Sequence, residues 1–232
     1  MPYIQEVRKM LLKHSEPSYK EGSRKFFKEQ INPHGVRIPN VRKIGNGFFK
    51  THTLSQKEYA ALGEKLLQSG YFEEGCLAFH FLGKFKRTFG KKEFSLLERW
   101  LDKYVDNWAW CDWLSTDLIA SAIKNNHSLA QHLLAWTAST NRWKVRSAAV
   151  SLVPLVKKGL FVREGLLIAK RNLHSRDDLV QKGTGCMLRE MAKAEKKKAY
   201  DFLMENKKGM GRTMMRYAVE HFTAAERKSV MQ

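Results

Sequence analysis

Apolar residues recur at every third or fourth position along almost the whole chain. This spacing places them on one face of an α-helix, and it is clearest at residues 59–67, 94–105, 128–136 and 165–173. No run shows the sustained alternation of apolar and polar residues that is typical of a β-strand. The pattern therefore predicts an all-α protein.

Helix-breaking residues divide the apolar pattern at regular places. They are residues 32–35, Gly70, Gly90, residues 125–126, Gly159, residues 174–175 and Gly209. Residues that favour helix starts are Pro39 in a first turn and the candidate N-caps Ser55, Ser128, Asn141 and Ser175. The short connections between segments predict stacked helical hairpins.

The second half of the chain carries a weak internal repeat at residues 143–152, 179–188 and 213–222. Each copy has a basic residue followed by small and then apolar residues, so that three cations share one register: Arg146, Lys182 and Arg216. A helical repeat of about 35 residues is typical of a TPR- or HEAT-like solenoid, whose hairpins stack into a superhelix with a concave side. We expect the three cations to form a row on that face. Exposed positions that happen to be basic are the alternative.

Length and charge narrow the class of protein. The 232 residues favour one continuous domain, residues 1–232, and 43% hydrophobic residues exclude a disordered chain. Lys and Arg number 42 against 23 Asp and Glu, which gives a net charge of +19. Such an imbalance favours a polyanionic partner that meets a basic concave face. The alternative is a basic surface that only keeps the protein soluble.

Cysteines, histidines and the chain start indicate where the protein works. The cysteines are far apart, form no CxxC pair and suit a reducing compartment: Cys76, Cys111 and Cys186. The start of the chain has no apolar signal core, and no apolar run approaches the ~18 residues of a membrane span. We expect a monomeric intracellular protein of the cytoplasm or nucleoid, with no membrane partner. The eight histidines show no ligand spacing, so we expect no metal site and no cofactor.

The densest chemistry lies at residues 106–113, where three tryptophans occur within six positions. They cannot all face one core. Trp108 and Asp112 are four residues apart and share a helix face, which sets an aromatic ring beside a carboxylate in a basic protein. A carboxylate repels DNA phosphate, so its place there makes sense if something cationic must sit nearby. The alternative is that Trp108 belongs to the core and Asp112 is a cap or an ion-pair partner.

Three motifs together resemble a known family. They are Asn-Trp-x-x-x-Asp at residues 107–112, Trp-x-x-Arg at 143–146 and Gln-Lys-Gly-x-Gly-x-x-Leu-Arg-Glu at 181–190. Their order and spacing resemble the AlkD-type DNA alkylation repair glycosylases, from about Phe26 to Phe222. The resemblance implies a HEAT-like solenoid that acts on duplex DNA.

The resemblance also implies an activity, the hydrolysis of the N-glycosidic bond of N3- and N7-alkylpurines in base excision repair. It gives Asp112 the catalytic role, Trp108 a sugar contact and Arg146 a phosphate contact. An aromatic residue near the lesion falls at Phe26 or Phe27. One position departs from the family, because a second tryptophan near the lesion aligns with Cys186. This departure affects either the activity or the choice of lesion.

The chemistry of such a reaction follows from the charge of the lesion. Alkylation at N3 or N7 makes the purine a cationic leaving group that needs no general acid. As the bond breaks, positive charge develops on the deoxyribose. A carboxylate aimed at the sugar stabilises that charge and could orient the attacking water, and an aromatic face adds about 0.5–2 kcal/mol.

Two other classes of function stay open. One is a non-catalytic DNA-binding solenoid for damaged or branched DNA, which the loss of an aromatic residue at Cys186 favours. The other is a protein-interaction scaffold of TPR or HEAT type. The joint presence of Trp108, Asp112 and Arg146 favours the glycosylase over the first, and the charge of +19 favours DNA binding over the second.

Two conspicuous features are better explained by structure than by function. Gly183 and Gly185 look like a phosphate loop, but they lie within helical periodicity and indicate close helix packing. Arg189 and Glu190 are better explained as an ion pair than as a catalytic pair.

Overall fold

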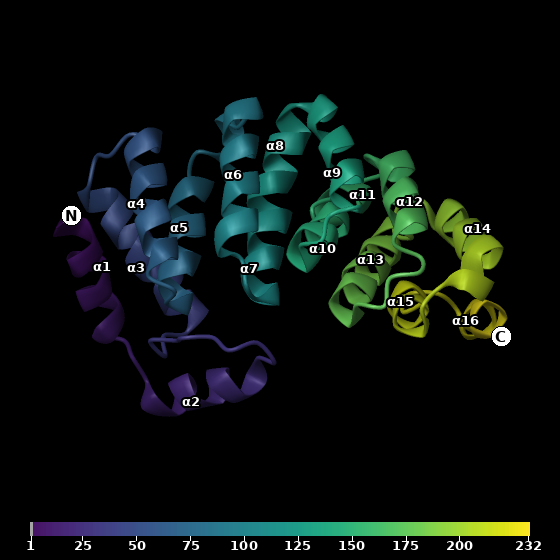
Figure 1. Cartoon of the computed structure of the whole chain (residues 1–232), viewed down its shortest axis with the longest axis horizontal. Helices are drawn as coiled ribbons and strands as arrows, with labels where there is room; N and C mark the ends of the chain where they lie inside the picture. The colour runs from purple at the N-terminus through teal and green to yellow at the C-terminus, as the bar shows by residue number, and fades with distance from the viewer. Residues whose placement is uncertain (1) are drawn as a thin grey trace. The chain divides into compact units, whose positions relative to one another are not determined.

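A computed structural model describes residues 2–232 of the protein, and Figure 1 shows its helices. Within that range there is no β-strand, and Asn32 and Tyr71 form an isolated bridge. The chain divides into two compact units, one of residues 1–89 and 103–110, the other of residues 90–102 and 111–232. The all-α prediction is confirmed.

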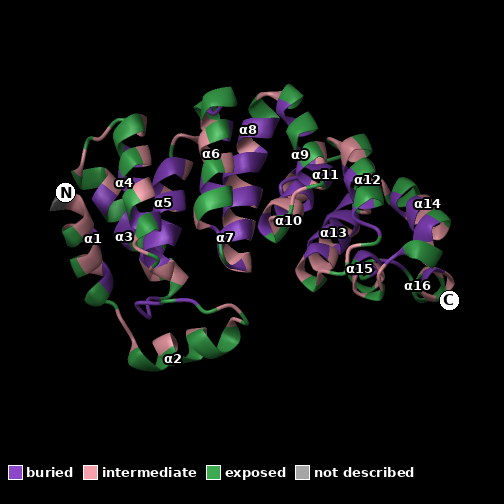
Figure 2. Ribbon diagram, in the orientation of Figure 1, coloured by how far each residue is buried: buried purple, intermediate pink, exposed green. Residues whose placement is uncertain are grey.

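The first unit begins with five α-helices and a 3-10 turn. Their bounds are α1 Pro2–Leu12, α2 Pro17–Phe26, α3 Ile38–Thr51, α4 Gln56–Gln68, α5 Phe72–Gly83 and the turn Lys86–Thr88. Helix α5 packs against α3 and α4, and α1 lies against all three. Helix α2 has no buried residue, so it lies outside this core, as Figure 2 shows by its lack of purple.

Helices α6 and α7 both cross the boundary between the units, and the rest of the second unit follows them. The bounds are α6 Lys91–Tyr104, α7 Trp108–Trp113, a π-helical turn Leu114–Ile119, α8 Ala120–Asn125, a 3-10 turn His127–Leu129, α9 Ala130–Trp136, α10 Arg142–Val150, α11 Val153–Val156, α12 Val162–Arg171, α13 Asp178–Met191, α14 Lys196–Asn206, a 3-10 turn Lys207–Gly209, α15 Arg212–Ala218 and α16 Ala224–Met231.

The predicted repeat corresponds to three helices of the second unit. Its copies lie in or overlap α10, α13 and α15, and α13 packs against both of the others. Helix α12 also packs against α13 and contacts α9. The equivalent helices therefore form one layer, as stacked hairpins require.

Helix starts test the predicted caps. The Ser55 hydroxyl accepts from the backbone N–H of Glu58 in a capping box, and the Asn141 side chain caps α10. The predicted caps Ser128 and Ser175 were wrong. Asn126 caps the turn that precedes α9, and the carboxylate of Asp177 accepts from two backbone N–H groups of α13. In both places a side chain two residues away from the predicted serine has the geometry to reach the free donors. Pro39 lies in the first turn of α3, as predicted.

Candidate active site

Helix α7 starts because Asn107 caps it. The buried Asn107 side chain accepts a hydrogen bond of 2.9 Å from the backbone N–H of Trp110, three residues later. The boundary between the two compact units falls after Trp110. Trp108 therefore belongs to the first unit and Asp112 to the second, and the surroundings of each are described within its own unit.

The three tryptophans of this segment have different environments. Trp110 is buried, and its indole N–H donates to the backbone oxygen of Phe72 at 3.0 Å. A Cβ on Gly75 would lie 2.1 Å from the Trp110 ring, so only glycine leaves room for this packing. Trp108 and Trp113 are half-buried. The prediction that the three rings do not share one core is confirmed.

An aromatic cluster surrounds Trp108 in the first unit. The ring of Phe27, just after α2, stacks on Trp108 with centroids 5.3 Å apart and also meets the edge of Phe72. Phe26 approaches Trp108 edge-on at 6.0 Å and is 69% exposed. The structure thus brings together the predicted residues Phe26, Phe27 and Trp108. Sequence reasoning missed Phe72, because its apolar side chain at a helix start carried no distinguishing signal.

The cluster borders a pocket of about 560 Å³, a volume that suits a small molecule. Aromatic and polar side chains of α2, α3, α5 and α7 line it. They include Tyr19, Ser23, Phe26, Phe27, Arg37, Phe72 and Trp108. The Arg37 guanidinium lies over the Tyr19 ring at 4.8 Å and pairs with Glu16 at 3.0 Å. Trp108 therefore has one face on Phe27 and also lines this open pocket.

Buried carboxylates hold the segment that carries Phe27. The Glu73 carboxylate, at the start of α5, accepts from the backbone N–H groups of His34, Gly35 and Val36 at 2.7–2.9 Å. Glu73 is 1% exposed. Three charge-assisted hydrogen bonds fix this loop against α5, and the loop runs directly from Phe27 to α3.

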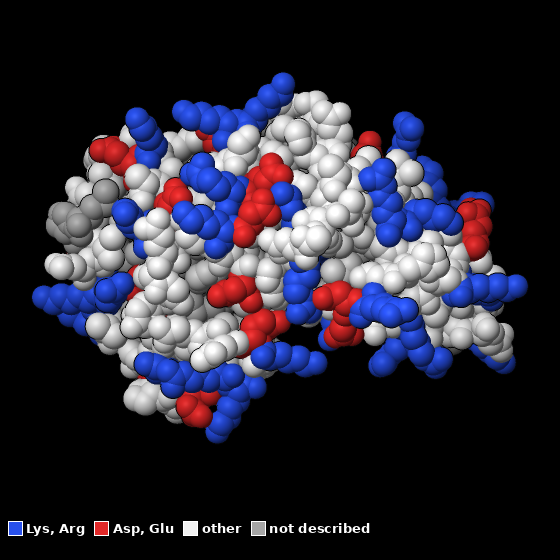
Figure 3. All heavy atoms as spheres, in the orientation of Figure 1, with Lys and Arg blue, Asp and Glu red and all other residues white. Residues whose placement is uncertain are grey.

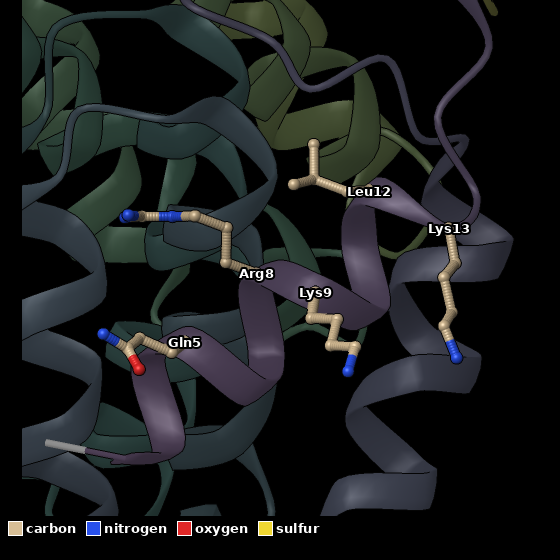
Figure 4. Close-up of a pocket in the computed structure, with 5 residues that line it drawn as sticks. All are labelled: Gln5, Arg8, Lys9, Leu12 and Lys13. Atoms are coloured by element: carbon tan, nitrogen blue, oxygen red, sulfur yellow. The ribbon is translucent and has the colours of Figure 1, made fainter.

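Glu74 fixes the same loop through side chains. One oxygen accepts from the Arg8 Nε at 2.7 Å and lies 2.9 Å from the His34 ring, and the other accepts from Arg8 Nη2 at 3.0 Å. Figure 4 shows Arg8 leaving α1 in a different direction from Lys9 and Lys13. Burial raises the pKa of Glu74, but hydrogen bonds from His34, Arg8 and Ser69 outweigh it and lower the pKa to about 2.

In the second unit, Asp112 forms a bidentate pair with Arg146 of α10. Arg146 Nε donates to Oδ1 and Nη2 donates to Oδ2, each at 2.8 Å. The Asp112 side chain is 31% exposed, whereas that of Arg146 is 9% exposed. The pair therefore presents its carboxylate to solvent and keeps its cation inside.

Arg146 is held from several sides. Its Nη1 donates to the backbone oxygen of Leu179 in α13. A Cβ on Gly183 would lie 3.2 Å from Arg146 Cγ and 3.0 Å from Val150, so the glycine makes room for the arginine stem. Burial lowers the pKa of Arg146, but the pairing with Asp112 outweighs this and raises it. The buried cation is stabilised by its partner and stays charged.

The burial of Arg146 shows that the expected row of three exposed cations was wrong. Arg146 is buried in an ion pair, so it does not lie on an exposed stripe with Lys182 and Arg216. Lys182 is one-third exposed and pairs with Asp178 at 2.7 Å, which raises its pKa. Arg216 is exposed. The register is shared, but only the side chains of α13 and α15 face solvent, because α13 covers Arg146.

Cys186 of α13 lies within electrostatic reach of this pair. Burial raises the pKa of its half-buried thiol, and the charges of Asp112 and Arg146 act on it in opposite directions. Its sulfur accepts a hydrogen bond from Arg189 Nη2 at 3.3 Å. Arg189 also pairs with Glu190 at 3.2 Å and with Glu220, so the predicted ion pair is confirmed.

The glycine motif of α13 serves helix packing, as predicted. A Cβ on Gly185 would lie 2.6 Å from the backbone oxygen of Met214 and 2.7 Å from Tyr217 Cβ in α15. Gly183 and Gly185 therefore allow α13 to approach the helices on both sides.

No three His, Cys, Asp or Glu side chains come together as a metal site within residues 2–232. In the same range no helix combines the length and apolar character that crossing a bilayer requires.

The model of a protein family described as "DNA alkylation repair enzyme" matches residues 7–222. This match covers most of the chain. The chain belongs to the DNA alkylation repair enzyme family. Its role is therefore in DNA alkylation repair, which implies DNA binding.

The fold of this family member agrees with a solved structure. A structure titled predicted DNA alkylation repair enzyme from Enterococcus faecalis superposes with a TM-score of 0.80 and 15% sequence identity. The superposition covers 91% of this chain and 98% of that chain. At this identity the likeness shows a shared HEAT-like helical fold. A search of curated proteins found no match.

Charged side chains are spread over the visible face of this family member. On the face shown in Figure 3, Lys and Arg side chains occur across the helices with Asp and Glu among them. With 42 basic and 23 acidic residues, cations dominate the whole chain. This surplus suits the sequence-independent attraction to a phosphate backbone.

Proposed function

We propose that this protein is a monomeric DNA glycosylase that hydrolyses the N-glycosidic bond of cationic N3- and N7-alkylpurines in duplex DNA. The observation that carries the proposal is the Asp112–Arg146 pair, whose carboxylate faces solvent. Membership of a DNA alkylation repair family supports the substrate class.

Asp112 stabilises the sugar as the bond breaks. The C1′–N bond cleaves, and its electron pair moves into the base and neutralises the alkylated ring. Positive charge then develops on the deoxyribose, and a nearby carboxylate stabilises it more than the ground state. Water attacks C1′ and loses a proton to Asp112 or to solvent, which leaves an abasic site and a neutral free base.

Arg146 acts as a positioning residue in this mechanism. Its two hydrogen bonds use one lone pair on each oxygen of Asp112 and leave another lone pair on each. The carboxylate is thus oriented but still able to face a cation. This role replaces the direct phosphate contact suggested by the resemblance, because a side chain that is 9% exposed with three of its N–H groups engaged is poorly placed to reach a phosphate.

The family resemblance assigns Trp108 a contact with the sugar, and within the first unit its ring offers an aromatic surface for one. Its stacking on Phe27 restrains the ring, and the exposed ring of Phe26 extends the aromatic surface. The contribution is about 0.5–2 kcal/mol, smaller than that of the carboxylate. We therefore assign Asp112 the main catalytic effect and Trp108 a supporting one.

Release of free base tests the proposal. The intact protein is incubated with a duplex that contains one N7-methylguanine, and the released base is quantified by mass spectrometry. The expected result is release by the wild type, none above background by Asp112→Asn, and none by either from a duplex with uracil, a neutral base. Equal release by wild type and Asp112→Asn, or robust removal of uracil, would contradict the mechanism.

A non-catalytic DNA-binding function is the second candidate, and Cys186 favours it. The residue supplies no aromatic face, and its sulfur accepts a hydrogen bond from Arg189. In that case the wild type would bind duplex or branched DNA with strong salt dependence and release no base. The two candidates are separated by measuring base release and DNA affinity on the same samples.

A further inference from the structure

A groove in the second unit lies between α12 and α14 and has no part in the proposed chemistry. Its volume is about 440 Å³, and its apolar surface comes from Val162, Leu166, Leu167 and Phe202. Leu167 is 43% exposed. The Lys170 ammonium donates to the Asn206 side chain, which links the two helices at the groove.

The groove residues of α12 form one helix face. Arg163, Leu166, Leu167 and Lys170 follow the spacing of three and four that aligns side chains along a helix. The buried residues of α12 lie on the opposite face, where Gly165 approaches α13. The groove therefore opens away from α13, the helix that carries Lys182 and Cys186.

Charge along the groove is mainly positive. Its charged side chains are Arg163, Lys170 and Lys198 against Glu205 alone. Arg163 is exposed and has no acidic partner within the described residues, and Lys198 is 57% exposed beside Glu195 at 3.2 Å. An apolar floor between cationic rims is complementary to a partner with apolar anchors and acidic flanks.

We propose that this groove docks an acidic amphipathic helix of a partner protein. Leucine-type anchors one turn apart would fill the space over Leu167 and Phe202, and flanking carboxylates would meet Arg163 and Lys198. DNA fits less well, because a phosphate backbone makes no use of the apolar floor. A second copy fits less well, because two chains of charge +19 repel each other.

The probe is a fluorescein-labelled synthetic peptide of about 18 residues, five helical turns, with leucines on one face and glutamates on both sides of them. Its binding to the intact protein is measured by fluorescence anisotropy. We expect saturable binding that Leu167→Glu weakens by at least about tenfold, since it places a charge in the apolar centre. Leu160→Glu is the matched control. Leu160 is an exposed leucine of the same unit outside the groove, and this variant should bind like the wild type.

A charge swap identifies the rim contacts. Arg163→Glu should weaken the glutamate peptide and strengthen a peptide in which lysines replace the glutamates. Circular dichroism and thermal unfolding confirm that each variant is folded, and base release should be unchanged in all of them. No saturable binding, equal binding by Leu167→Glu and wild type, or equal binding of a scrambled peptide would each overturn the proposal. Displacement of the peptide by duplex DNA, or dimerisation in sedimentation that Leu167→Glu abolishes, would replace the helix by another occupant.

Discussion

Each unit contains a carboxylate paired with an arginine, and the two pairs differ in which partner is exposed to solvent. In the first unit the Glu74 side chain is 0% exposed and its partner Arg8 is 39% exposed. In the second unit Asp112 is 31% exposed and Arg146 is 9% exposed. A pair whose anion is inside positions its surroundings, whereas a pair whose anion faces outward can act on a cationic ligand.

The oxygens of these carboxylates support the same distinction. Glu73 accepts three hydrogen bonds from backbone N–H groups, and Glu74 has three polar contacts with Arg8 and His34, all within the first unit. Asp112 receives two hydrogen bonds from Arg146 and keeps unused lone pairs. Carboxylates of equal charge thus differ in function, and their exposure together with the number of hydrogen bonds they accept distinguishes them.

The largest expected effect is on stability. Glu74→Ala should lower the free energy of unfolding by about 3–5 kcal/mol, because it removes the buried carboxylate that pairs with Arg8 and leaves the buried His34 ring without its partner. Urea unfolding followed by circular dichroism measures it. Glu21→Ala is the control, since Glu21 makes only an exposed pair with Lys25, and it should cost under about 1 kcal/mol. Equal costs for both variants would remove the distinction between the pairs.

Asp112→Asn should affect base release strongly and stability only weakly. Base release should fall by about 10²–10³-fold, the cost of losing an electrostatic contact to the transition state. Its unfolding free energy should fall by only about 1–3 kcal/mol, the value of hydrogen bonds to a charged group. Single-turnover release and urea unfolding on one preparation test both. A loss of stability larger than that of Glu74→Ala would make Asp112 primarily structural.

The pH dependence of stability should distinguish the Glu74 pair from the Asp112 pair. The pKa of Glu74 is lowered to about 2, so its ionised form contributes stability above its ordinary pKa of 4.5. This contribution, on the order of 3 kcal/mol, is lost as pH falls from about 4.5 to 2, where the unfolded chain binds the proton first. The stability difference between wild type and Glu74→Gln should shrink over that range. A difference independent of pH would show that the charge of Glu74 is not what stabilises the loop.

An aromatic ring added near Asp112 should change the rate of base release by a smaller amount. Cys186→Trp should speed release of small methylpurines by up to roughly tenfold if the added contact is worth about 1 kcal/mol. It should not help a bulky adduct. Cys76→Ser, at a buried position of the first unit, tests for unspecific effects of replacing a cysteine. An unchanged rate in a folded, DNA-bound Cys186→Trp protein would mean that residue 186 does not face the lesion.

The smallest effects are expected for single surface cations. Arg216→Ala should weaken DNA binding few-fold and reduce the salt slope by about one, as for the loss of one phosphate contact. Lys182→Ala should do less, because Asp178 already neutralises it. Lys13→Ala, just after α1, removes an exposed cation outside the layer of α13 and α15 and serves as the reference. Affinity that is insensitive to salt would argue against phosphate contacts by any of them.

Much of the fold and part of the site could be predicted from the sequence. The helical period and the packing role of Gly183 and Gly185 depend on residues close in the chain, and the shared register of α10, α13 and α15 is a repetition of such a short pattern. The family resemblance likewise depended on short motifs. These signals are local, because helix periodicity and motif spacing are properties of a short stretch of chain.

Only the tertiary structure decided which partner each charge has. Arg146 and Asp112 are 34 residues apart, and Arg8 and Glu74 are 66 apart, so no local pattern relates them. The sequence therefore suggested an exposed Arg146 and passed over Glu73, Glu74 and Phe72. Burial removes water as a competing partner, so a charged side chain must pair with whatever group packing brings to it. That group comes from a distant helix and is set by how the helices stack.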